Sequence, residues 1–212
     1  SLQDFNIVLA LFEGLTQYDP KDSHPIPGVA THWDSTPDAK TWTFYLRDNA
    51  KWSNGDPVTA HDFDYAYRRM LSPALASEYA YMLFCLTGAE DYVGGKSTDF
   101  STVGVKVMDD YTIRFSLAYP VPYFPDLIAH ASWYPVHQGT IEAHGRMDQR
   151  GTRWTRPGNL VGNGPFVLSE WKPNQVIRVT KSPTYWDAEV VRLNGINFYP
   201  IESSSSEEAA FR

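Results

Sequence analysis

Residues 41–71, TWTFYLRDNAKWSNGDPVTAHDFDYAYRRML, predict a strand, a turn and a helix in that order. Trp42, Phe44 and Leu46 occupy every second position, and this period of two is typical of a strand with one buried face. Residues 53–57, SNGDP, come after the strand. They predict a turn, because Asn, Gly and Asp tolerate positive φ or bond to the nearby backbone, and Pro fixes φ.

The helix is predicted to begin after Thr59. A Thr at this position can cap the free N–H groups of the first helical turn, and Asp62, three residues later, completes a reciprocal capping pair. Arg68 and Arg69 lie near the C-terminal end, where the helix dipole favours positive charge. The apolar positions form a single stripe, made of Phe63, Ala66, Tyr67, Met70 and Leu71.

The flanking sequence predicts further helices and strands. Residues 5–12 are apolar except at Asn6 and predict a helix buried on most sides. The other predicted elements are a helix at 73–83, a hairpin at 105–117, at most a short helix within 123–131, a polar loop at 144–159, a hairpin at 166–180, a strand at 196–198 and the start of a helix at 203–211. The last pattern stops without a capping residue, so we expect the sequence to be a piece of a longer protein.

Composition and charge exclude some classes of function. Hydrophobic residues make up 42% and charged residues 20% of the 212 residues, which is typical of a globular protein. The net charge is −7 and no basic cluster exceeds the pair Arg68 and Arg69, so nucleic acid is not an expected partner. No apolar run reaches the roughly 20 residues of a membrane span. Cys85 is the only cysteine, which leaves no internal disulfide, and its apolar neighbours predict a buried thiol.

Patterns that indicate catalysis are weak. The sequence contains no G-x-S-x-G, H-E-x-x-H, Walker or C-x-x-C motif, so we predict no catalytic residue and no cofactor. The G-N-G sequence at 162–164 precedes a proline and a predicted strand, which favours a tight turn over a phosphate site. His130 and His137 have no third ligand nearby, so no metal site is predicted. The acidic pair at 109–110 is typical of a solvated hairpin turn.

Aromatic side chains are abundant, at 15% of the sequence with 7 Trp and 13 Tyr. Such a surplus can fill a core or line a binding cleft, and the residues alone leave both alternatives open. The candidates for cleft residues are Tyr79, Tyr81, Trp133, Tyr134, Tyr185 and Trp186.

The segment WTFYLRDNAKWSNGDPVTAHDFDYAYRR resembles the signature segment of the family 5 solute-binding proteins, and within it the oligopeptide-binding branch. Five further segments agree in the same order, so the resemblance covers nearly the whole chain. They are LFEGL at 11–15, PGVATHWD at 27–34, PVPYFPDL at 120–127, TRPGNLVGNGPFVL at 155–168 and KSPTYWD at 181–187.

The resemblance implies an α/β fold of the type II periplasmic-binding-protein kind. Residues 13–137 would form an inserted β-rich subdomain, and residues 1–12 with 138–212 would form part of the first lobe. The chain would stop before the second lobe. An intact protein of this family captures peptides between two lobes and presents them to a membrane permease.

The resemblance also implies three peptide-binding residues. Tyr79 matches a tyrosine in the helix after the signature segment, and His130 matches a histidine after the proline-rich segment. Leu2 would belong to an extended segment that pairs with the peptide backbone before the first helix. The residues that bind the two charged ends of the peptide would lie in the other lobe.

We therefore expect the substrate-binding component of an ABC peptide importer, monomeric, with an oligopeptide as ligand and no enzymatic activity. It would work in the periplasm or as an extracytoplasmic lipoprotein. Alternatives within the family are receptors for dipeptides, murein peptides or a nickel chelate. A carbohydrate-binding module would be nearly all β, which the predicted helices oppose. A hydrolase would carry a recognisable nucleophile or acid/base pair, which the sequence lacks.

Overall fold

The computed structural model describes residues 2–200, and of residues 2–4 it describes the backbone only. Its sheet with the most strands is a four-stranded antiparallel sheet in the order β3-β4-β6-β5. The strands are β3 (Ala30–Ser35), β4 (Thr41–Leu46), β5 (Val105–Asp109) and β6 (Thr112–Ser116). Both predictions for this sheet are confirmed, because β4 alternates between half-buried and buried residues and β5 with β6 forms a hairpin.

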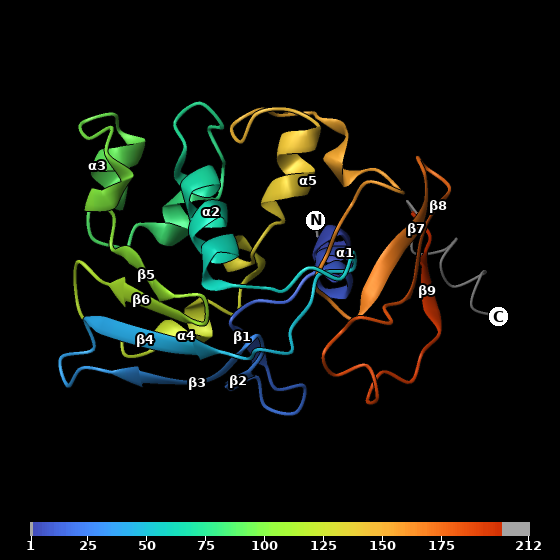
Figure 1. Cartoon of the computed structure of the whole chain (residues 1–212), viewed down its shortest axis with the longest axis horizontal. Helices are drawn as coiled ribbons and strands as arrows, with labels where there is room; N and C mark the ends of the chain where they lie inside the picture. The colour runs from blue at the N-terminus through green and yellow to red at the C-terminus, as the bar shows by residue number, and fades with distance from the viewer. Residues whose placement is uncertain (1, 201–212) are drawn as a thin grey trace.

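Helix α2 (Ala60–Leu71) lies beside this sheet (Figure 1). Phe63, Ala66, Tyr67 and Leu71 of its predicted apolar stripe are buried. The helix begins as predicted, since the Asp62 carboxylate accepts the Thr59 N–H at 2.8 Å. Its central side chain, Tyr67, is fully buried and donates its hydroxyl to the Trp133 carbonyl oxygen at 3.1 Å. The Tyr67 ring meets Phe115 and Trp133 edge to face, which suits the ring quadrupoles. Phe44 and Phe124 meet those two rings in the same way.

A second, three-stranded antiparallel sheet has the order β7-β8-β9, with β7 at Phe166–Lys172, β8 at Val176–Lys181 and β9 at Gly195–Phe198. This confirms the predicted hairpin and the strand after it. Helix α1 (Leu2–Leu11) lies between the two sheets (Figure 1). A two-stranded sheet of β1 (Thr16–Tyr18) and β2 (Pro25–Pro27) follows α1.

Short helices fill the connections. The α-helices are α3 (Ala89–Val93), α4 (Phe124–Leu127) and α5 (Gln138–Ala143), and the 3₁₀ helices are η1 (Ala80–Leu83), η2 (Phe100–Thr102), η3 (Ala131–Trp133) and η4 (Arg153–Thr155). The short helix expected within 123–131 is thus α4, and most of 144–159 is irregular as predicted. No helix of the described residues is both long enough and apolar enough to span a bilayer.

The glycines at 162 and 164 allow the loop before β7 to touch the end of α1. The Gly164 N–H donates to the Leu11 carbonyl oxygen at 3.0 Å. A Cβ at Gly162 would lie 2.1 Å from that same oxygen, so only glycine permits this approach. The 162–164 segment therefore packs closely on the end of α1, but its backbone closes no hydrogen-bonded turn, so the predicted tight turn is not what the structure shows.

Two predictions about helices are wrong. Residues 73–83 form turns and the 3₁₀ helix η1 instead of a continuous helix, because Ala76 has a φ of +49°, which breaks the helical path. Helix α1 is less buried than its apolar sequence indicates, since Leu9 is 38% exposed and Ile7 and Val8 are half-buried. The predicted helix start at 203–211 lies outside the described residues.

The hydrophobic core is continuous across these elements. Buried residues of α1, of the four-stranded sheet and of β7 and β8 belong to one cluster, as Leu11, Phe44 and Leu168 illustrate. The division into an inserted subdomain at 13–137 and a lobe of 1–12 with 138–212 stays a prediction.

Candidate functional site

Tyr79 and His130 line the same open hollow, of about 370 Å³. Tyr79 precedes η1 and His130 precedes η3. Their ring centroids are 6.1 Å apart, and the ring of Phe5, from α1, lies 5.2 Å from His130. Val8, Met70, Ala131 and Ser132 complete the lining.

Hydrogen bonding fixes the protonation pattern of His130. Its Nδ1 accepts the Ser132 backbone N–H at 3.2 Å and lies 2.9 Å from the Ser132 hydroxyl. Partial burial lowers the pKa of His130, which favours the neutral ring. In a neutral ring whose Nδ1 accepts, the proton is on Nε2. His130 thus offers an Nε2–H donor beside the hollow.

Tyr79 contributes an exposed ring. Its side chain is 53% exposed, and that of Tyr81, 6.3 Å away between ring centroids, is exposed as well. Among the residues whose side chains the structure describes, no lysine, arginine, aspartate or glutamate lines this hollow. The hollow therefore combines two polar side-chain ends with apolar walls, which is the usual composition of a site for an uncharged part of a ligand.

Leu2 does not lie in an extended segment, because it is the first residue of α1. The helix thus extends beyond the apolar run that begins at Phe5, through the polar residues Gln3 and Asp4. The side chain of Leu2 is outside the described part of the chain.

Glu13 is a buried carboxylate that the sequence interpretation missed. It is 3% exposed, and it accepts the Tyr185 hydroxyl and the Trp186 Nε1–H, each at 2.6 Å. The Gln17 side-chain amide also donates to it. Burial raises the pKa of Glu13 to about 7, while the bonds from Tyr185 and Trp186 and the charge of Arg47 act to lower it.

The backbone of Glu13 is bound as firmly as its side chain. The Asn163 side chain accepts the Glu13 N–H at 3.0 Å and donates to the Glu13 carbonyl oxygen at 2.9 Å. Glu13 is the only charged residue of the apolar run 7–15, IVLALFEGL. This isolation is the signal that could have marked it as a residue with buried partners.

Four of the aromatic cleft candidates are accounted for by other contacts. Trp133 and Tyr134 are core residues. Tyr185 and Trp186 are half-buried and bind Glu13, and the Arg47 guanidinium lies 3.4 Å from the Trp186 ring centroid. Only Tyr79 and Tyr81 among the six candidates are exposed.

The structure does not bring His130 and His137 together as ligands. His137 bonds to Thr140 through Nδ1 and to Asp56 through Nε2 at 3.0 Å. Asp109 accepts the Tyr111 N–H as a turn residue. Among the described residues, the potential metal-ligand atoms that do lie close belong to Asp19, Asp22 and His24, on a mostly exposed loop where Asp22 already bonds to His24.

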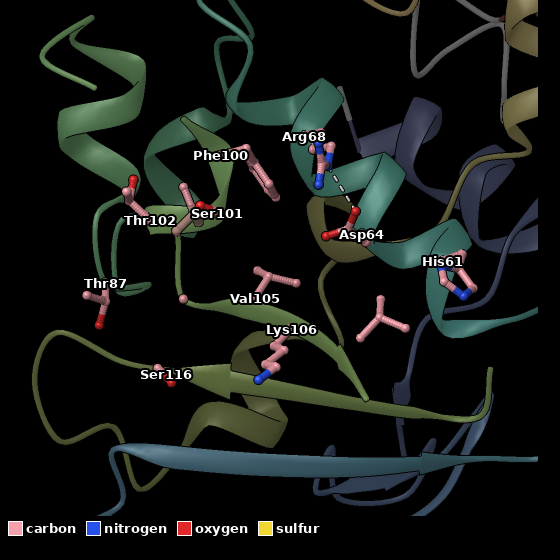
Figure 2. Close-up of a pocket in the computed structure, with 13 residues that line it drawn as sticks. His61, Asp64, Arg68, Thr87, Phe100, Ser101, Thr102, Val105, Lys106 and Ser116 are labelled. Atoms are coloured by element: carbon pink, nitrogen blue, oxygen red, sulfur yellow. Dashed lines mark hydrogen bonds and ion pairs between the residues drawn. The ribbon is translucent and has the colours of Figure 1, made fainter. Parts of the chain in front are cut away.

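Another hollow, of about 650 Å³, lies between α2 and the segment from Phe100 to Val107 (Figure 2). Figure 2 shows Arg68 between Asp64 and Phe100. The Arg68 Nε donates to Asp64 at 2.9 Å, and the guanidinium lies 4.7 Å from the Phe100 ring centroid. Because Arg68 is already engaged on both sides, we assign this hollow no ligand.

Comparison with known proteins gives a consistent result. The chain is 43% identical over 209 residues to the periplasmic oligopeptide-binding protein OppA of Escherichia coli K12, which covers 98% of the chain and 37% of that protein. It is 38% identical to the periplasmic murein peptide-binding protein MppA of the same organism, over 97% of the chain and 37% of that protein.

A solved structure agrees in fold. OppA of Haemophilus influenzae, in complex with the peptide RPPGFSPFR, superimposes with a TM-score of 0.92 at 39% identity, over 99% of this chain and 40% of that one. The chain thus spans about two fifths of the length of these relatives. The profile of the bacterial extracellular solute-binding proteins, family 5, matches residues 24–212. The chain belongs to this family of extracellular solute-binding proteins, as the resemblance of its signature segment predicted.

Proposed function

We propose that this chain is part of the substrate-binding component of an ABC importer and that its ligand is an oligopeptide. One observation carries the proposal: Tyr79 and His130, which are far apart in the sequence, line one open hollow whose described lining carries no charged side chain. Both positions are those at which the family resemblance places contacts to the peptide.

The chemistry of the hollow suits a peptide backbone with varied side chains. The Nε2–H of His130 can donate to a peptide carbonyl oxygen, and the Tyr79 hydroxyl can donate or accept. Phe5, Val8 and Met70 offer apolar walls that impose no charge requirement on the ligand. Backbone bonds would supply affinity that tolerates many sequences, while the walls accept different side chains.

The wider assignment rests on the relatives. The proteins compared above bind oligopeptides or murein peptides by name. By that analogy the whole protein would be a monomer that closes around its ligand, works in the periplasm or as an extracytoplasmic lipoprotein, and delivers the ligand to a membrane permease. Capture of this kind is reversible and breaks no bond. Dipeptides, murein peptides or a nickel chelate are the alternative ligands.

The test is an NMR titration of this chain with trialanine. We expect saturable shifts of backbone resonances at residues 77–83 and 128–133, with a dissociation constant of about 1 mM or weaker. Binding is expected to be weak because one wall of a cleft supplies only part of the contacts that offset the entropy lost on binding.

Two variants make the titration decisive. His130→Ala removes the Nε2–H donor and is expected to weaken the response about tenfold, which corresponds to about 1.4 kcal/mol. His61→Ala changes an exposed histidine on α2, away from this hollow, and is expected to leave the response unchanged. No saturable shift with trialanine, or an equal response in His130→Ala, would overturn the proposal.

A further inference from the structure

A smaller hollow, of about 200 Å³, opens beside Glu13. It is bounded by the end of α1, by β1, by the residue after η3 and by the loop after β8. Within the described part of the chain, Glu13 is the only charged residue in its lining, and four of the others are aromatic. The full lining is Leu9, Phe12, Glu13, Gln17, Tyr18, Tyr134, Pro165 and Tyr185.

Glu13 has no cationic partner at bonding distance among the described residues. Its three bonds come from neutral donors. The nearest guanidinium, of Arg47, stacks on Trp186 and donates its Nε–H to the Gly28 carbonyl oxygen at 2.8 Å. Asp187 adds a second negative charge near the carboxylate. A buried carboxylate in this state is stabilised when a cation binds beside it.

Aromatic rings around a carboxylate form the standard recognition chemistry for ammonium groups, because ring faces and the carboxylate both attract positive charge. We propose that this hollow binds a small alkylammonium ion, with Glu13 as counter-ion and with Phe12, Tyr18 and Tyr134 as aromatic walls. The Gln17 amide already donates to Glu13 Oε1. An ammonium N–H would replace that amide at the same oxygen.

This site is separate from the hollow of Tyr79 and His130, since the two linings share no residue. The proposal therefore does not depend on peptide binding. Its ligand is defined by charge and size: one positive nitrogen with a short apolar substituent.

The test is an NMR titration of this chain with methylammonium chloride, run beside sodium chloride at equal ionic strength. The indole Nε1–H of Trp186 is the reporter, because it donates to Glu13 Oε2 at 2.6 Å. We expect a saturable shift with methylammonium only. We also expect the shift to saturate at lower concentration at pH 8 than at pH 6, because ionised Glu13 is the binding form and its pKa is about 7. Tyr134 and Tyr185, whose pKa values burial raises, stay neutral over that range.

Variants separate binding from a change in structure. Glu13→Gln removes the counter-ion and is expected to weaken methylammonium binding at least about tenfold. Tyr18→Leu removes one wall at the exposed rim and is expected to weaken binding about threefold. Tyr119→Leu, at an exposed tyrosine outside the hollow, is expected to change nothing.

The same Trp186 Nε1–H shift with sodium chloride, or unchanged methylammonium binding in Glu13→Gln, would overturn the proposal. If Glu13→Gln fails to fold, Tyr18→Leu decides: methylammonium binding equal to that of the unmodified chain would overturn the proposal.

Discussion

The buried carboxylate of Glu13 predicts an unusual dependence of stability on pH. Its pKa is about 7 in the folded chain against an ordinary value of 4.5. Between these values the folded chain holds a proton that the unfolded chain has released. Since the folded state binds more protons there, stability falls as the pH rises.

The size of the effect follows from the two pKa values. A difference of about 2.5 pH units corresponds to about 3 kcal/mol, of which about 2.5 kcal/mol is lost between pH 5 and pH 8. The contribution of Glu13 is complete below pH 4.5 and absent well above pH 7. Glu13→Gln cannot titrate, so its stability lacks this component.

The assay is urea unfolding followed by tryptophan fluorescence at pH 5, 6, 7 and 8. At each pH we take the difference in free energy of unfolding between the original chain and Glu13→Gln. We expect this difference to fall by about 2.5 kcal/mol from pH 5 to pH 8. Glu170→Gln is the control: bonds to Lys172 and Arg178 lower the pKa of the half-buried Glu170, so its stabilising effect is lost only at more acidic pH. A constant difference for Glu13→Gln from pH 5 to pH 8 would refute the reasoning, and would mean that the three donors fully offset the cost of burial.

Three further changes test other parts of the fold. Gly164→Ala would place a Cβ 2.6 Å from the Phe12 nitrogen, and we expect urea unfolding to show a free energy of unfolding about 2–3 kcal/mol lower. A decrease below about 0.5 kcal/mol would contradict the tight packing of this loop on α1. Asp62→Ala removes the acceptor of the Thr59 N–H and is expected to lower the free energy of unfolding by about 1 kcal/mol. Asp64→Ala breaks an ion pair with Arg68 and is expected to lower it by about 0.5 kcal/mol or less. Equal losses in the two variants would argue against the capping role of Asp62. Cys85 is buried and burial raises its pKa to about 12, so it is expected to resist a thiol reagent at pH 8 until urea unfolds the chain; rapid labelling of the folded chain would contradict this burial.

Elements specified by local chemistry could be predicted from the sequence. The strand at Thr41–Leu46 follows from its period of two, and the helix start at Thr59 follows from a capping pair within four residues. The run at 73–83 misled the prediction, because its apolar spacing gives no sign of the positive φ at Ala76. Burial of α1 was overestimated, because an apolar run does not show how much of a helix its neighbours cover.

The candidate sites depend on contacts between distant parts of the chain. No local pattern pairs Tyr79 with His130, and only the family resemblance selected the two together. Glu13 receives hydrogen bonds from residues 172 and 173 positions away, which no periodicity can indicate. Its isolation within an apolar run was visible, but the identity of its partners was not.

The double hydrogen bond between Glu13 and Asn163 has a consequence for how the chain folds during synthesis. The two residues are 150 positions apart. At about 5–20 residues per second, a ribosome needs roughly 8–30 s to extend the chain from one to the other. Strands β3 to β6 are complete within that interval, whereas the end of α1 must remain without its partner. Full docking of the first helix is therefore a late event, timed by translation of the loop before β7.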